Sequence, residues 1–104
     1  PPRRRAVVTG LGVISPIGST PAALWAALAA GTPGVARLRA FDPTPLPCQL
    51  AGEVPDFNAK ALIEKSYRKQ LNAMSRTVQL GVVVAQFAMQ DAGLAKGTVP
   101  PERI

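Results

Sequence analysis

The chain has 104 residues, of which 47% are hydrophobic and 17% charged, a composition typical of a folded protein rather than a disordered one. The longest nearly apolar run, residues 80–89, is too short to cross a bilayer. The basic N-terminus is not followed by the apolar core and cleavage site of a signal peptide. We therefore expect a cytoplasmic protein without a membrane partner.

Twelve Lys and Arg residues against six Asp and Glu give a formal net charge of +6. Such a balance can serve nucleic-acid binding, because basic side chains neutralise phosphates. The basic residues are scattered, however, except in two clusters: Arg3 to Arg5, and Lys65, Arg68 and Lys69. Aromatic residues do not interleave with them as a stacking platform requires. We therefore expect no nucleic-acid partner, and an acidic protein is the better candidate for a compact basic patch.

The first part of the chain predicts one strand and one helix. Residues 5–9 are a β-branched run, which indicates a strand buried on at least one face. A loop rich in glycine and proline follows over 10–18. Thr20 is then a candidate N-cap, Pro21 fits a first helical turn and Gly31 a helix end. The helix between them should lie on a sheet.

The middle of the chain is predicted to be mostly irregular. Four prolines exclude a helix over residues 32–47. Residues 48–54 indicate a second strand, which Pro55 terminates. Asn58 is a candidate cap for a short helix over 59–64, and a polar, basic stretch follows it.

The longest predicted element is a helix from about Arg76 to Ala92. Ser75 can cap its start, and Gly93 stands where a left-handed residue ends a helix. A narrow stripe at spacings of 4, 3 and 4 holds its polar residues and one valine: Gln79, Val83, Gln86 and Gln90. Nearly everything else on this helix is apolar. A helix that is apolar over most of its circumference is covered on more than one side, and this chain has little else to cover it.

The end of the chain is predicted to be a loop over 95–102, followed by the opening of another strand at Arg103 and Ile104. The inventory is then two clear strands and two clear helices. A two-stranded sheet makes a weak core. We therefore expect residues 1–104 to be a piece of a larger α/β protein rather than a complete domain.

Gly10 and Gly12, after a predicted strand, resemble a dinucleotide-binding fingerprint. The third glycine position is Ser15, and Pro16 prevents a helix from starting directly after the turn. No acidic residue closes a second strand at the distance that the fingerprint requires. We interpret the two glycines as structural and expect no nucleotide cofactor.

Cys48 is the only cysteine, and the chain has no histidine. A nucleophilic cysteine needs a base or an electropositive environment to form the thiolate, so Cys–His catalysis within this chain is impossible. Because Cys48 lies in an apolar predicted strand, we expect a packed, inert thiol. One cysteine and six scattered carboxylates make no metal-ligand set, and no residue is assigned to a metal or a cofactor.

Lys65, Arg68 and Lys69 lie at i, i+3 and i+4 and would share one face of a helical turn, beside Tyr67. The ordinary interpretation of such a cluster is a solvated surface. Arg3 to Arg5 are interpreted in the same way, as a solvated terminus.

Taken in order, these pieces resemble the N-terminal segment of the β-ketoacyl-acyl-carrier-protein synthases, most of all the elongating type. The most specific block is Val-Thr-Gly-Leu-Gly-x-x-Ser-Pro-x-Gly, at residues 8–18. The further matches follow in the family's order: Trp25 with Leu28, Gly34-Val35, Phe41-Asp42, residues 50–54, Asp56-Phe57, residues 74–94 and residues 101–104. The resemblance spans essentially the whole chain.

The resemblance implies the thiolase-like fold, in which two related α/β halves form a layered α-β-α-β-α arrangement, usually as a homodimer. In this family a cysteine takes an acyl chain from an acyl carrier protein. Two histidines help to decarboxylate the malonyl-carrier and to stabilise the new carbanion. These three residues lie beyond residue 104, so no catalytic residue is expected in this segment, and Cys48 does not match the nucleophile's motif.

The resemblance also implies one functional surface. In similar enzymes a basic cluster just before the long helix receives the acidic acyl carrier protein, and Lys65, Arg68 and Lys69 lie at the matching place. Two alternatives stay open. The first is a homologue of the same fold without condensing activity, such as a chain-length-factor-like protein. The second is a small stand-alone module that binds an acidic partner.

Overall fold

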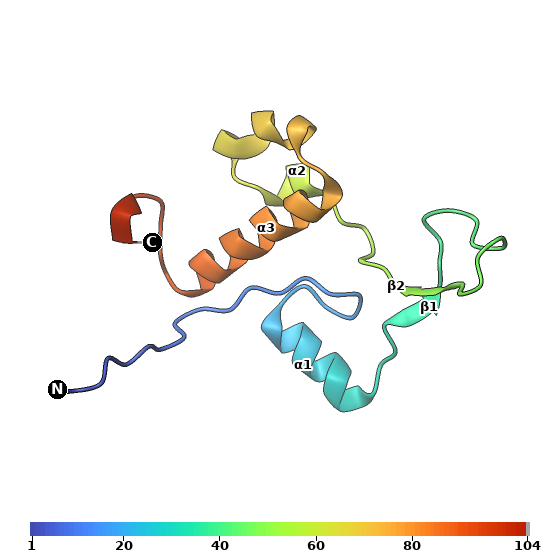
Figure 1. The fold of residues 1–104 in the computed structure, drawn as a ribbon, viewed down its shortest axis with the longest axis horizontal. Helices are drawn as coiled ribbons and strands as arrows, with labels where there is room; N and C mark the ends of the chain where they lie inside the picture. The colour runs from blue at the N-terminus through green and yellow to red at the C-terminus, as the bar shows by residue number, and fades with distance from the viewer. Residues whose placement is uncertain (104) are drawn as a thin grey trace.

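A computed structural model describes residues 1–103 (Figure 1). The elements are α1 (Pro21–Ala30), β1 (Val35–Arg37), β2 (Leu50–Gly52), α2 (Ala59–Leu62), the 3₁₀ helix η1 (Lys65–Ala73), α3 (Arg76–Asp91) and the 3₁₀ helix η2 (Pro101–Arg103). The radius of gyration is 17.3 Å, against about 13 Å for a compact domain of this length. The accessible surface is 8380 Å², against roughly 5,600 Å² for a folded monomer of this mass. The chain is therefore spread out, and it leaves much apolar surface uncovered.

The predicted first strand is wrong. Residues 1–14 form no strand, and the side chains of Val7 and Val8 are each 79% exposed. Figure 1 shows this segment as an extended chain that leads from the N-terminus to α1. The β-branched side chains favour an extended backbone, but a strand also requires a hydrogen-bonded neighbour. No other strand among residues 1–103 pairs with it.

Helix α1 has the predicted boundaries. The Thr20 hydroxyl accepts a hydrogen bond from the Ala23 N–H at 3.1 Å. Gly31 ends the helix in the left-handed conformation, with φ of 68°. The expectation that α1 lies on a sheet is wrong. The helix instead begins against the preceding loop, where a Cβ added to Gly18 would come within 3.1 Å of Ala23.

Strands β1 and β2 form an antiparallel pair in which Val35 is opposite Gly52 and Arg37 is opposite Leu50. The second predicted strand is thus confirmed in a shorter form. The prediction of irregular structure over residues 32–47 is wrong at β1. Proline excludes a helix from that range, but β1 itself holds no proline and keeps its N–H groups for pairing.

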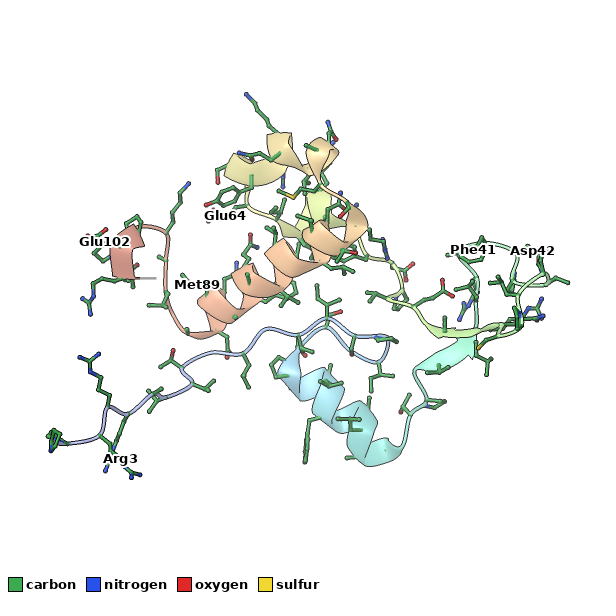
Figure 2. The ribbon with its side chains drawn as sticks, in the orientation of Figure 1. Arg3, Phe41, Asp42, Glu64, Met89 and Glu102 are labelled. Atoms are coloured by element: carbon green, nitrogen blue, oxygen red, sulfur yellow. The ribbon has the colours of Figure 1, made fainter. Side chains whose placement is uncertain are left out.

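The loop between β1 and β2 is held by carboxylates that accept backbone hydrogen bonds. Glu53 accepts from the N–H groups of Arg39 and Ala40 at 2.7 and 3.0 Å. Asp42 accepts from the hydroxyl and the N–H of Thr44, and these two hydrogen bonds lower the pKa of the Asp42 carboxyl. Figure 2 shows Phe41 and Asp42 on this loop, far from α3.

The core lies between α2, η1 and α3. Its buried members are Ala59, Ile63, Leu71 and Val83, with Ile14, Phe57, Met74, Val82 and Phe87 packed against them. Asn58 stands at the N-cap position of α2 but makes no capping hydrogen bond with its side chain. Helix α2 ends at Leu62, before the predicted end at residue 64, because Ile63 has an extended backbone. The basic stretch after it forms η1, which the sequence did not predict.

Helix α3 begins and ends close to the predicted residues. The Ser75 hydroxyl accepts from the Val78 N–H at 3.4 Å, and Gly93 has φ of 72°. The strand predicted to open at Arg103 is wrong there, because Arg103 belongs to η2, and Ile104 lies outside the described residues. None of the helices in residues 1–103 is long and apolar enough to cross a membrane.

Candidate functional site

Most of the polar stripe of α3, namely Gln79, Val83 and Gln86, faces α2 and η1. The Gln86 amide donates to the carbonyl of Leu62 at 2.8 Å and accepts from the Glu64 N–H at 2.9 Å. Gln79 donates to the carbonyls of Leu71 and Met74, at 3.2 and 3.3 Å. Val83, between these glutamines, is fully buried. The glutamines therefore bind the irregular backbone of α2 and η1, whose carbonyl and N–H groups need partners.

A second face of α3 receives the segment around Gly10 and Gly12. A Cβ added to Gly12 would lie 2.2 Å from the Val84 carbonyl oxygen, and one added to Gly10 would lie 2.5 Å from that of Ala88. The Leu11 N–H between them donates to the Asp91 carboxylate at 2.8 Å. These glycines allow two backbones to touch, which is the structural role expected of them.

The remaining face of α3 is apolar and uncovered. Val78 is 48% exposed, and Gly81 and Ala85 are exposed as well. Helix α1 has a similar uncovered surface: an apolar groove of about 300 Å³ runs beside it, and Trp25 on its wall is 74% exposed. Exposed apolar side chains that gather on one face mark places where other protein can pack.

The predicted docking residues lie on η1 but do not share one face. In a 3₁₀ helix residues i and i+3 are aligned, so Lys65 and Arg68 stand in a row with Leu71, and Lys69 lies about a third of a turn away. Lys65 and Lys69 are exposed, whereas Arg68 is half-buried. The expectation of a shared face assumed α-helical periodicity, which this segment does not have. Side chains with terminal nitrogen atoms project from this part of the ribbon, away from α3 (Figure 2).

Arg68 lines a cavity of about 410 Å³ between α2, η1 and the start of α3. Its Nε atom is enclosed and has no hydrogen-bond partner among the described residues. An unpaired buried donor costs about 1–3 kcal/mol, and more when it is charged. The other polar residues on the cavity wall are Asn58, Lys60, Asn72 and Gln79.

Two residues near the cluster were missed from the sequence. Lys96, in the segment after α3, places its ammonium 5.1 Å from the centre of the Tyr67 ring. Lys60 lies on the cavity wall, on α2. Neither shares a helical spacing with the predicted cluster, so only the folded arrangement brings them to it.

Cys48 is exposed, and its sulfur lies 3.7 Å from the Leu50 carbonyl oxygen. The expectation of a packed thiol is therefore wrong. Strand β2 begins after Cys48 and is only three residues long, so it does not place Cys48 within a core. The contact with a carbonyl provides no base that would form a thiolate.

Known proteins match this chain over nearly its full length. Residues 3–104 match the family described as "Beta-ketoacyl synthase, N-terminal domain". The chain is 41% identical over 93 residues to the 3-oxoacyl-[acyl-carrier-protein] synthase 2 of Coxiella burnetii. This match covers 88% of this chain and 22% of the relative. It is 39% identical over 101 residues to the tetracenomycin polyketide synthase ketoacyl synthase alpha subunit of Streptomyces glaucescens. This match covers 97% of this chain and 23% of the relative.

A solved structure agrees with these matches. The ishigamide ketosynthase/chain length factor superposes with a TM-score of 0.80 at 39% identity, covering 91% of this chain and 23% of that one. The chain thus spans less than a quarter of the length of these relatives. The glycines that contact α3 lie in the most specific block of the resemblance, residues 8–18. The chain belongs to the β-ketoacyl synthase family, and its fold is that of part of the family's N-terminal domain.

Proposed function

We propose that this chain is the N-terminal structural part of a β-ketoacyl-acyl-carrier-protein synthase. The whole enzyme would condense acyl and malonyl carrier thioesters by a decarboxylative Claisen reaction, in fatty-acid or polyketide synthesis. The observation that carries the proposal is the family match over residues 3–104. Relatives that bear the names of such synthases support it.

The segment itself would position rather than catalyse. It has no histidine, and its one thiol is exposed and contacts a backbone carbonyl oxygen. The nucleophile and the two histidines would come from the remainder of the enzyme. The uncovered faces of α1 and α3 are the surfaces on which that remainder would pack, because their apolar side chains gain stability only when they are removed from water.

The test begins with the intact mass of the polypeptide that carries this segment in its native source. We expect a mass several times 10.9 kDa, and a purified protein that condenses acyl-carrier and malonyl-carrier substrates and behaves as a homodimer. A native mass near 10.9 kDa would contradict the proposal, because the segment alone lacks the condensing machinery.

A second candidate is a homologue of the same fold that does not condense. One similar structure is named as a ketosynthase/chain length factor. Its name thus includes a chain length factor as well as a ketosynthase, which supports this candidate. The purified protein distinguishes the candidates. A chain-length-factor-like protein would show no condensation alone and would co-purify with a second, condensing subunit of similar size.

We further propose that Lys65, Arg68 and Lys69 contribute to docking of an acidic acyl carrier protein. The exposure of Lys65 and Lys69 on η1 supports this role. Lys96, held beside Tyr67, extends the positive surface. Exposed charges of this kind speed encounter and set orientation more than they add affinity.

Charge reversal tests the docking surface. We expect Lys65→Glu with Lys69→Glu to weaken carrier binding about tenfold or more and to flatten its dependence on salt. The matched control is Arg4→Glu with Arg39→Glu, which reverses two exposed cations that lie outside η1. Equal losses in the control and the double variant would indicate a general effect of net charge and would remove the docking proposal.

A further inference from the structure

The cavity between α2, η1 and the start of α3 carries positive charge without acidic groups. Lys60 and Arg68 line it from two different elements, and none of the described residues on its wall is acidic. The Arg68 Nε–H is enclosed and lacks an acceptor. A buried charged donor without a partner is unfavourable, so the described residues alone leave this site incomplete.

The neutral polar residues on the wall divide into two kinds. The Gln79 amide nitrogen donates to two backbone carbonyls, those of Leu71 and Met74, and so holds the C-terminal end of η1. Asn58 makes no capping hydrogen bond although it occupies a capping position, and Asn72 is exposed on η1. The two asparagine amides therefore remain as donors beside the two cations.

We infer that this cavity is a binding site for an oxyanion, a carboxylate or a phosphate group. A guanidinium presents a planar set of N–H donors that matches the oxygens of either group, and the lysine adds a second positive charge. The volume of about 410 Å³ would hold on the order of ten waters, so one such group and a few waters fit. Arg68 belongs both to this cavity and to the proposed docking cluster, whereas Lys65 and Lys69 do not line the cavity, so substitutions at those two lysines separate the two roles.

The experiment uses inorganic phosphate as the probe and the native polypeptide as the protein. Line broadening of the phosphorus resonance, followed as protein is added at constant ionic strength, gives the dissociation constant. We expect saturable binding that Arg68→Gln and Lys60→Gln each weaken about tenfold. Lys69→Gln is the matched control, because it removes the same charge from η1 without lining the cavity, and it should weaken binding less than twofold.

Thermal unfolding checks that each variant is folded. Lys60 is exposed, so Lys60→Gln keeps the test informative even where substitution of the half-buried Arg68 unfolds the protein. Competition by acetate identifies the source of the ligand. The competition gives a dissociation constant for acetate. A constant lower than that of phosphate indicates that the site takes a carboxylate, and a higher constant indicates that it takes a phosphate group. Absence of saturable binding by both anions, or an equal loss in Lys69→Gln, would overturn the inference.

Discussion

The two halves of this chain are ordered by different means. In residues 57–92, α2, η1 and α3 share a core around the fully buried Val83, and glutamine side chains bind the backbone of the shorter elements. In residues 1–54, α1 has good caps at both ends but no buried residue, and the two strands pair only with each other. Caps and turn residues are thus sufficient to define an element, while burial depends on neighbours that the first half does not provide for itself.

The two halves meet where Gly10 and Gly12 touch α3. Gly12→Ala disturbs this contact and should cause the largest loss of stability. Its Cβ would lie 2.2 Å from the Val84 carbonyl oxygen, a backbone atom that cannot rotate away. We expect a loss of about 3 kcal/mol in the free energy of unfolding, from overpacking. Denaturant unfolding of the native polypeptide measures it. A loss below about 0.5 kcal/mol, the range of surface substitutions, would show that the two halves do not pack in this way.

The sequence predicted the features that depend on local chemistry. Thr20, Ser75, Gly31 and Gly93 all act at helix ends as expected, because capping is decided within one turn of backbone. The strand at residues 5–9 failed for the opposite reason. Its β-branched residues favour an extended backbone, but the hydrogen-bonding partner that defines a strand is not among residues 1–103.

The candidate site was predicted by position but not by geometry. The basic residues before α3 were found from their clustering, yet η1 has the 3₁₀ repeat, so Arg68 is turned toward the cavity while Lys69 is not on its wall. The role of the glutamine stripe was also hidden. Gln86 binds backbone groups of Leu62 and Glu64, and no hydrophobic pattern signals a polar side chain that serves an irregular backbone.

Gln86→Ala tests how far the second half depends on these glutamines. The substitution removes one donor and one acceptor that α2 and its following turn use. Each net hydrogen bond contributes about 0.5–1.5 kcal/mol, so we expect a loss of about 1–2 kcal/mol. The matched control is Gln90→Ala, on the same stripe but exposed, which should change stability by less than about 0.5 kcal/mol. Equal losses in the two variants would mean that helix propensity, not these contacts, sets the effect.

Gly81→Ala should have the smallest effect, and its sign reports on the uncovered face of α3. Gly81 lies within the helix, and a Cβ added to it meets no atom within 4 Å. Alanine should therefore stabilise the helix in the 104-residue chain, by up to about 1 kcal/mol, seen as greater helicity by circular dichroism. A loss of helicity would show that this face is covered within the chain itself. In the native polypeptide the same substitution should lose stability if the remainder of the synthase packs closely here, because close packing is what justifies a glycine in mid-helix. An increase in stability in both proteins would show that the rest of the enzyme does not pack closely on this face of α3. Helix α1, with its exposed Trp25, would then be the main packing surface.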